Sequence, residues 1–234
     1  MDRFAAIADI HGNRWALEAV LADIDRRGIS RIVNLGDHLF GPLDPAGTAD
    51  LLIGLRPPWV VKNIAGNQDR DPMDLSPSHQ EWLDALPFSL QMPGIMLFHG
   101  TPLADNLYLL ETVHRDGVSL AEPEQIAERL GTGERSPLLL CGHSHIPRVV
   151  AFGESLIVNP GSVGLQAYTD DAPLPHRMET GSPHARYAIL EQDTAGWRVD
   201  LLQVPYDYEA AAACALRNGR EDWAFRLRTG RAAN

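Results

Sequence analysis

Residues 4–13 read FAAIADIHGN, an apolar run that ends at Asp9, with His11 two positions later. A short apolar run that stops at polar and glycine residues predicts a buried strand followed by a tight turn. Apolar residues then recur at helical spacing over Trp15–Arg27, and Gly28 lies where a helix-ending glycine belongs. This segment therefore predicts a strand and a helix of one βαβ unit, with an acid and an imidazole at the end of the strand.

The same arrangement recurs four times in the next 130 or so residues: an apolar run is followed by glycine and a polar side chain. The predicted strands are Ile32–Leu35, Trp59–Ile64, Ile95–Phe98 and Leu138–Cys141. Helices are expected to begin at Pro45 and Pro77, each after a capping residue, and another is expected over Pro123–Leu130. Strands that alternate with helices indicate βαβ units and a largely parallel sheet.

The second half of the chain has another pattern. Its predicted strands are Arg148–Phe152, Ser155–Val158, Arg186–Leu190 and Trp197–Val204, and a last helix is expected over Tyr208–Arg217. The first two strands leave no room for a helix between them, so they are expected to pair antiparallel. Residues 165–183 are rich in Pro, Asp and His and are expected to form a surface loop. The chain is predicted to be an α/β protein with two packed sheets and helices outside, not a closed barrel.

Composition and charge restrict the classes of function. The 234-residue chain is 44% hydrophobic and 22% charged, which is ordinary for a globular protein. Its 20 basic and 31 acidic residues give a net charge of −11, which argues against general nucleic-acid binding because phosphate backbones require Lys and Arg. No apolar run approaches the roughly 20 residues of a membrane helix, and no signal-peptide core is present. Two cysteines cannot form a disulfide framework. A cytoplasmic protein without membrane contact is expected.

The polar residues at the five strand ends form a candidate set of metal ligands. They are Asp9, His11, Asp37, Asn67, His99, His143 and His145. Ligands bind at the carboxyl ends of strands in open α/β sheets, and these residue types suit Mn²⁺, Fe, Zn²⁺ or Mg²⁺. Seven ligands are too many for one ion and enough for two. A carboxylate can bridge two ions, so Asp37 is expected to bridge them, in a locally positive pocket suited to phosphate.

The order of the motifs D-x-H, G-D, G-N-x-D, H-G and G-H-x-H resembles that of the calcineurin-like metallophosphoesterase superfamily. DIHGN at Asp9–Asn13 and NPGSVG at Asn159–Gly164 resemble its small bacterial and archaeal phosphodiesterase branch. The resemblance implies a four-layer α/β/β/α sandwich of two mixed sheets flanked by helices, with residues 1–234 as one metallophosphoesterase domain. It also implies two divalent cations, with Mn²⁺ first and Fe, Zn²⁺, Ni²⁺ or Co²⁺ as alternatives.

The resemblance also assigns roles by motif position. One cation would be held by Asp9, His11, Asp37 and His145, and the other by Asp37, Asn67, His99 and His143. A hydroxide bridging the cations would attack the phosphorus of a phosphodiester, with phosphomonoesters as a further substrate class. The expected catalytic residues are Asp37, Asn67, Gln68 and His99. Asn13, Arg14 and Arg70 are the expected substrate-binding residues, with a helix cap as the alternative for Asn13 and solvated charges for the two arginines.

The chain departs from the family pattern at Gln68, where the family commonly has a histidine in G-N-H-D. Gln68 can donate a hydrogen bond but cannot release a proton, which could cost about 10²–10⁴-fold on a poor leaving group. A second departure shortens G-D-x-x-x-x-G by one residue at 36–41, where His38 is an alternative proton donor. Gln68 motivates a rival hypothesis, a scaffold of the same fold that binds a partner protein with little hydrolysis.

A third hypothesis, a barrel-fold metal hydrolase acting on a C–N or ester bond, is disfavoured by the antiparallel second half. Residues 103–120, which contain Tyr108, are expected to form a surface loop. Together with residues 165–183 they are expected to set specificity. The sequence leaves the physiological substrate, the native metal and the oligomeric state open.

Overall fold

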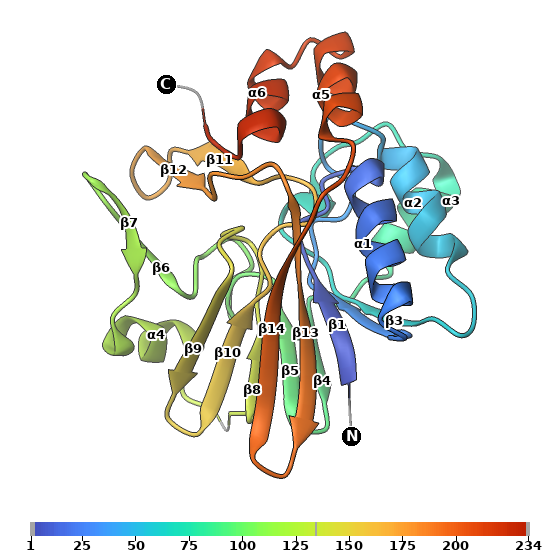
Figure 1. Cartoon of the computed structure of the whole chain (residues 1–234). Helices are drawn as coiled ribbons and strands as arrows, with labels where there is room; N and C mark the ends of the chain where they lie inside the picture. The colour runs from blue at the N-terminus through green and yellow to red at the C-terminus, as the bar shows by residue number, and fades with distance from the viewer. Residues whose placement is uncertain (1–2, 134, 233–234) are drawn as a thin grey trace.

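Two five-stranded mixed sheets form the centre of the protein, as seen in a computed structural model that describes residues 3–133 and 135–232 (Figure 1). In order across the first sheet, the strands are β14 (Gly196–Val204), β13 (Ala185–Asp193), β1 (Arg3–Ile7), β2 (Arg31–Asn34) and β3 (Val60–Asn63). Strands β1, β2 and β3 run parallel, whereas β13 is antiparallel to both of its neighbours.

The second sheet has a parallel centre with antiparallel edges. Its strands are β4 (Ser89–Met92), β5 (Ile95–Phe98), β8 (Leu138–Leu140), β10 (Ser155–Asn159) and β9 (Arg148–Phe152). Strand β8 pairs in parallel with β5 and β10, and the short β9–β10 connection gives the expected antiparallel pair. The predicted fold of two mixed sheets flanked by helices is therefore confirmed, and the parallel pairing is limited to three strands in each sheet.

Alternation along β1 explains how the sheets and helices form layers. Phe4 and Ala6 pack in a buried cluster with side chains of the second sheet, such as Leu97 and Leu140. Ile7 points to the other face, where it packs with the apolar side of a helix. Successive side chains of a strand point to opposite faces, so this apolar strand is covered on both sides.

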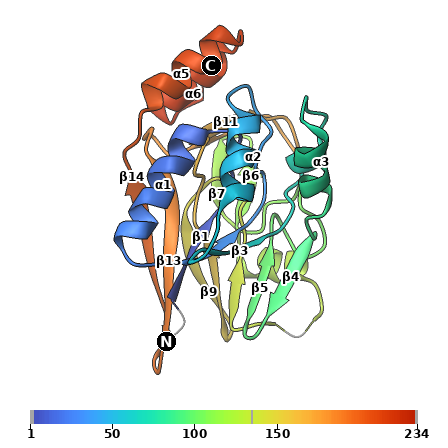
Figure 2. The same ribbon diagram turned by 90° about the vertical axis from the view of Figure 1, so that its right-hand side faces the viewer.

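Six α-helices and a short 3-10 helix complete the described part of the chain. They are α1 (Arg14–Arg26), α2 (Pro45–Gly54), η1 (Gln68–Arg70), α3 (Pro77–Asp84), α4 (Pro123–Leu130), α5 (Tyr208–Arg217) and α6 (Glu221–Thr229). Figure 2 shows α1, α2 and α3 side by side on one face of the molecule. Asp44 and Ser76 cap α2 and α3 with their side chains, which confirms the predicted helix starts. Among the residues that the structure describes, no helix combines the length and apolar character needed to cross a bilayer.

Two expectations about loops were wrong, and so was the expectation that α5 is the last helix. Residues 165–183 contain a hairpin of β11 (Ala167–Asp170) and β12 (His176–Glu179), and residues 103–120 contain another of β6 (Glu111–His114) and β7 (Gly117–Leu120). The chain also continues beyond α5 into α6, which was not expected, and both helices lie at the top of Figure 1 beside β11. Strand β11 and helix α6 supply residues to the cavity described below.

Candidate metal centre

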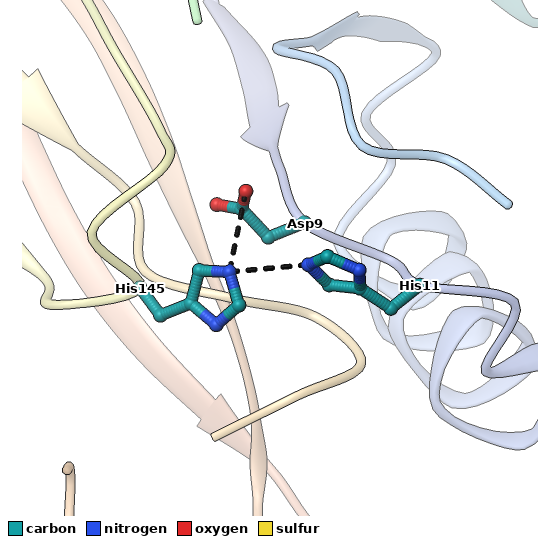
Figure 3. A group of neighbouring side chains, drawn as sticks. All are labelled: Asp9, His11 and His145. Atoms are coloured by element: carbon teal, nitrogen blue, oxygen red, sulfur yellow. Dashed lines mark hydrogen bonds and ion pairs between the residues drawn. The ribbon is translucent and has the colours of Figure 1, made fainter. Parts of the chain in front are cut away.

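The ends of four strands converge and bring six of the seven predicted ligands into two buried groups. The first group is Asp9, His11 and His145, and the second is Asp37, His99 and His143; the ligand atoms within each group lie within 4.8 Å of one another. Figure 3 shows the side chains of the first group pointing toward one another. Asp9, His11 and Asp37 follow strands of the first sheet and the other three follow β5 and β8 of the second, so each group draws on both sheets.

The backbone is strained at five of the six candidate ligands. Asp9, His11, Asp37, His143 and His145 have φ angles between 52° and 66°. This left-handed region costs a non-glycine residue roughly 1–2 kcal/mol. Within residues 3–133 and 135–232, every non-glycine residue with positive φ belongs to this set. Strain concentrated in one set of ligands, and held by the surrounding structure, is characteristic of functional sites.

Backbone carbonyl groups fix the orientation of three of the imidazole rings. The Nδ1 atoms of His11, His99 and His145 lie 3.1, 2.7 and 2.6 Å from the carbonyl oxygens of Phe40, Leu35 and Leu165. A carbonyl oxygen only accepts, so each Nδ1 carries a hydrogen and donates it. The Nε2 atom of each neutral ring then presents a lone pair, the arrangement found for histidines that bind metals.

The acceptor atoms that meet at the centre fit divalent cations. Nε2 of His11 lies 3.1 Å from Nε2 of His145, and Nε2 of His99 lies 3.4 Å from Oδ2 of Asp37. Buried Oδ2 of Asp9, Nε2 of His99 and Oδ1 of Asn67 have no hydrogen-bond partner within the described residues. Buried acceptors left without a donor are costly unless a cation binds them, and imidazole with carboxylate suits Mn²⁺, Fe or Zn²⁺.

The pKa values of two histidines in the metal-free cluster agree with a buried cation site. Burial lowers the pKa of His99, but the charges of Asp37 and Asp9 outweigh burial and raise it to about 10. Burial and the charge on His99 lower the pKa of His143 to about 4. Without a cation, the Nε2 lone pair of His99 is therefore occupied by a proton, and a cation bound at Nε2 would displace that proton.

Asp69 positions the backbone on which Asp37 lies. Its carboxylate accepts hydrogen bonds from the amides of Asp37, His38 and Gly66 at 2.7–2.9 Å, and lies 2.7 Å from Nδ1 of His38. The His38 ring is fully buried against Trp82 and does not line the cavity described below, so the interpretation of His38 as a proton donor was wrong.

Asp69→Asn is expected to lower the free energy of unfolding by about 2 kcal/mol, because an amide nitrogen would face donors that the carboxylate now accepts. Urea unfolding measures this effect. The matched control is Asp71→Asn, since Asp71 is exposed and should tolerate the same change. Equal unfolding midpoints for the two variants would contradict the positioning role.

The NPGSVG segment braces the ligand turns from the other side. The Asn159 amide donates to the carbonyl oxygen of Gly142 at 2.7 Å, and the Ser162 hydroxyl donates to that of Asp9 at 2.8 Å. The Gly164 amide also donates to the carbonyl oxygen of Asp9, at 3.0 Å. These bonds explain how residues 159–164 contribute to the centre without supplying a ligand.

A cavity of about 390 Å³ opens onto the two groups. The residues of the centre that line it are His11, Asp37, Asn67, Gln68, His143 and His145. The remaining wall is formed by Phe40, Leu165, Tyr168, Thr169, Asp170, Arg220, Trp223 and Arg226. Asn67 and Gln68 thus lie where the sequence placed them, next to the ligands, whereas His99 is completely buried.

A family model described as the calcineurin-like phosphoesterase superfamily domain matches residues 3–190 of this protein. The chain belongs to the calcineurin-like phosphoesterase superfamily. Members of the superfamily are mostly hydrolytic phosphoesterases, and they typically bind divalent metals. The two buried groups are therefore candidate metal-binding groups in a fold that uses such metals.

Three relatives show how far the similarity extends. A crystal structure of a metallophosphoesterase from Sphaerobacter thermophilus has a TM-score of 0.75 and 25% identity, covering 97% of this chain and 98% of the other. A hypothetical protein from Pyrococcus horikoshii OT3 shares the fold, with a TM-score of 0.74, 18% identity and full coverage of both chains. An uncharacterized protein of Methanocaldococcus jannaschii is 26% identical over 94% of both chains. The calcineurin-like phosphoesterase fold thus accounts for nearly the whole chain.

The three predicted substrate-binding residues do not line this cavity. Asn13 caps α1 through Oδ1, and its amide nitrogen donates to the carbonyl oxygen of Gly164, so the cap alternative is the one observed. Arg14 pairs with Asp44 at 3.2 Å, and Arg70 pairs with Asp105. Being next to a ligand motif in the sequence did not predict which side chains line the cavity, because the turns direct these three side chains to other partners.

Sequence reasoning assigned no role at the site to two tyrosines that contact the candidate metal-binding groups. The Tyr108 ring stacks on the ring of His143, with the centroids 4.8 Å apart, so Tyr108 is not part of an exposed loop. The Tyr168 hydroxyl lies 3.0 Å from that of Tyr108 and donates to the carbonyl oxygen of His143 at 2.9 Å. Arg220, Trp223 and Arg226 on the cavity wall were also missed. The acidic residues Glu221 and Asp222 just after Gly219 were an available signal for the start of α6.

Proposed function

We propose that this protein is a binuclear metal-dependent phosphoesterase that hydrolyses phosphodiesters, with phosphomonoesters as a further substrate class. The observation that carries the proposal is the set of buried, unpartnered acceptor atoms of Asp9, Asn67 and His99 beside an open cavity. One cation would be held by Asp9, His11, Asp37 and His145, and the other by Asp37, Asn67, His99 and His143. We further propose that residues 1–234 act as one domain, since α6 supplies part of the cavity wall.

Two divalent cations, with Mn²⁺ as the first choice, would supply Lewis acidity toward phosphoryl oxygens and acidify water near neutral pH. The chain's own residues orient and enclose the reacting phosphate. The backbone amide of Gln68 donates to Oδ1 of Asp37 at 2.9 Å, and Gln68 lines the cavity. That side chain can donate to an ester oxygen but cannot protonate it, so esters with acidic leaving groups are favoured.

The test is hydrolysis of bis(p-nitrophenyl) phosphate by metal-stripped protein before and after addition of Mn²⁺. We expect turnover only with Mn²⁺, together with two bound ions for each chain. The melting temperature should rise by about 5 °C or more, because an ion that binds only the folded state stabilises it. His145→Gln should lose these responses, and the matched control His114→Gln, at an exposed position, should keep them.

A second candidate function, a scaffold that binds a partner protein with little hydrolysis, is favoured by a specific feature: Gln68 occupies the cavity where a proton donor would be needed for poor leaving groups. Bis(p-nitrophenyl) phosphate has an acidic leaving group and does not need that donor. Absence of turnover despite two bound Mn²⁺ ions would therefore overturn the enzymatic proposal and favour the scaffold.

A further inference from the structure

Helix α6 and the turn before it place two arginines on the wall of the cavity that opens onto the metal-binding groups. Arg220 is the residue that precedes α6 and Arg226 lies within it, and both line the cavity together with His11 and Asp37. Trp223 contacts both a candidate metal ligand and one of the arginines. Its ring packs edge to face against the ring of His11, with the centroids 6.1 Å apart, and the Arg220 guanidinium carbon lies 5.6 Å from the centroid of the Trp223 ring. Arg220, Trp223 and Arg226 lie outside the segment 3–190 that matches the family model.

Two acidic side chains lie beside these arginines. The Asp222 carboxylate accepts hydrogen bonds from Nε and Nη2 of Arg220 at 2.9 and 2.8 Å, and lies 3.4 Å from Nη2 of Arg226. One carboxylate can neutralise only one of two guanidinium groups. The cavity wall also holds Asp170, whose oxygens accept from the Ala172 amide at 3.0 Å and from the Tyr108 hydroxyl at 3.4 Å. Asp170 and Asp222 together offset the charges of the two guanidinium groups, so the arginines would hold an anion through hydrogen bonds that these carboxylates leave unmade.

Arg226 also has unused hydrogen-bonding capacity. Only 13% of its side chain is exposed, and one of its terminal nitrogens, Nη2, donates to the hydroxyl of Thr169 at 3.2 Å. Its Nε is buried and has no hydrogen-bond partner among the described residues. A buried donor without an acceptor is costly, and a bound anion is the natural acceptor for a guanidinium group.

We propose that Arg220 and Arg226 bind a second phosphate group of the substrate, separate from the phosphate that is hydrolysed at the metal-binding groups. This inference rests on the proposed function, which it narrows to a substrate class: phosphate esters that carry a second phosphate group beyond the one that reacts. A guanidinium group donates paired hydrogen bonds to two oxygens of a phosphate. Two neighbouring arginines therefore bind a dianionic group more tightly than a neutral one.

The test compares two esters with the same reacting bond and the same p-nitrophenol leaving group. They are thymidine 5′-(p-nitrophenyl phosphate) and its 3′-phosphorylated form, assayed with the Mn²⁺-loaded protein. The wild type should prefer the 3′-phosphorylated ester. Arg226→Gln and Arg220→Gln should each lower the ratio of the two kcat/KM values by about tenfold, the effect of losing one charge-assisted hydrogen bond. Arg228→Gln is the matched control, because Arg228 lies on the same helix but pairs with Glu209 and does not line the cavity.

A binding measurement separates this inference from the proposed function. Calorimetric titration of the Mn²⁺-loaded protein with thymidine 3′,5′-bisphosphate should give a Kd about tenfold below that of thymidine 5′-monophosphate, and Arg226→Gln should remove the difference. If the wild type hydrolyses neither ester but shows this difference, the proposed function fails and the arginine site stands. Unchanged ratios of kcat/KM and equal affinities for the two nucleotides would overturn the arginine site, even in an active enzyme.

Discussion

Asp37→Asn is expected to lower the kcat for bis(p-nitrophenyl) phosphate by roughly 10³-fold or more, since both proposed cations depend on this carboxylate. Oδ2 of Asp37 lies 3.4 Å from Nε2 of His99 in one group and 3.9 Å from Nε2 of His11 in the other. Asparagine removes the negative charge and replaces one oxygen by an amide nitrogen, which cannot bind a cation. Initial rates with saturating Mn²⁺, and the number of ions retained after gel filtration, measure the effect.

Asparagine is chosen because it should leave the backbone conformation at position 37 unchanged. The φ angle of Asp37 is 54°, a left-handed conformation that asparagine adopts about as readily as aspartate. Asp116→Asn, the same change at an exposed position in the β6–β7 turn, is the matched control and should retain the wild-type rate. An Asp37→Asn variant that binds two ions and hydrolyses the ester at the wild-type rate would contradict the assignment of Asp37 as the shared ligand.

Gly164→Ala is expected to lower the free energy of unfolding by about 3 kcal/mol. A β-carbon at this position would overlap the carbonyl oxygen of Ile10 and lie 2.8 Å from the β-carbon of Asn13. Both contacts are within the turn that carries Asp9 and His11, so the turn must move, and forced overpacking of this kind costs about 1–3 kcal/mol or more. Chemical denaturation measures the loss, and Mn²⁺-dependent turnover should fall with it.

The matched control for Gly164→Ala is Gly54→Ala. Gly54 is the last residue of α2, and a β-carbon there would meet nothing within 4 Å. Alanine favours helix over glycine by up to about 1 kcal/mol, so this variant should be as stable as the wild type or slightly more stable. Equal unfolding midpoints for the two variants would show that the close approach of residue 164 to the ligand turn is unimportant.

The convergence of six candidate ligands could be predicted from the sequence because it depends on local patterns. Strands β1, β2, β5 and β8 are short and mostly buried, so their ends are clear, and the residues that follow must lie at one edge of the sheets. Asp9, Asp37 and His143 are thus located by the strands that precede them, without knowledge of distant contacts. The same reasoning correctly gave the capped starts of α2 and α3.

The cavity wall could not be predicted because it depends on long-range packing. The β11–β12 hairpin has a polar, proline-containing sequence that resembles a loop, and only its packing over the strand ends gives Tyr168 a role. Arg226 is an ordinary surface-type residue in a polar helix until α6 folds back against β11. Asn13 and Arg70 show the opposite error, since neighbours in sequence were assigned to a cavity that their side chains do not reach.

Each proposed metal-binding group takes its side chains from both sheets, and this has a consequence for how the protein opens. A cation held by His11 and His145, or by Asp37 and His99, would act as a cross-link between the two halves of the sandwich. Local opening of either sheet would then break the coordination of both ions. The free energies of local opening of the two sheets would therefore rise together. Metal supply would thereby set how cooperatively the chain unfolds, and how well its backbone amides are protected from exchange with solvent, as well as whether it reacts.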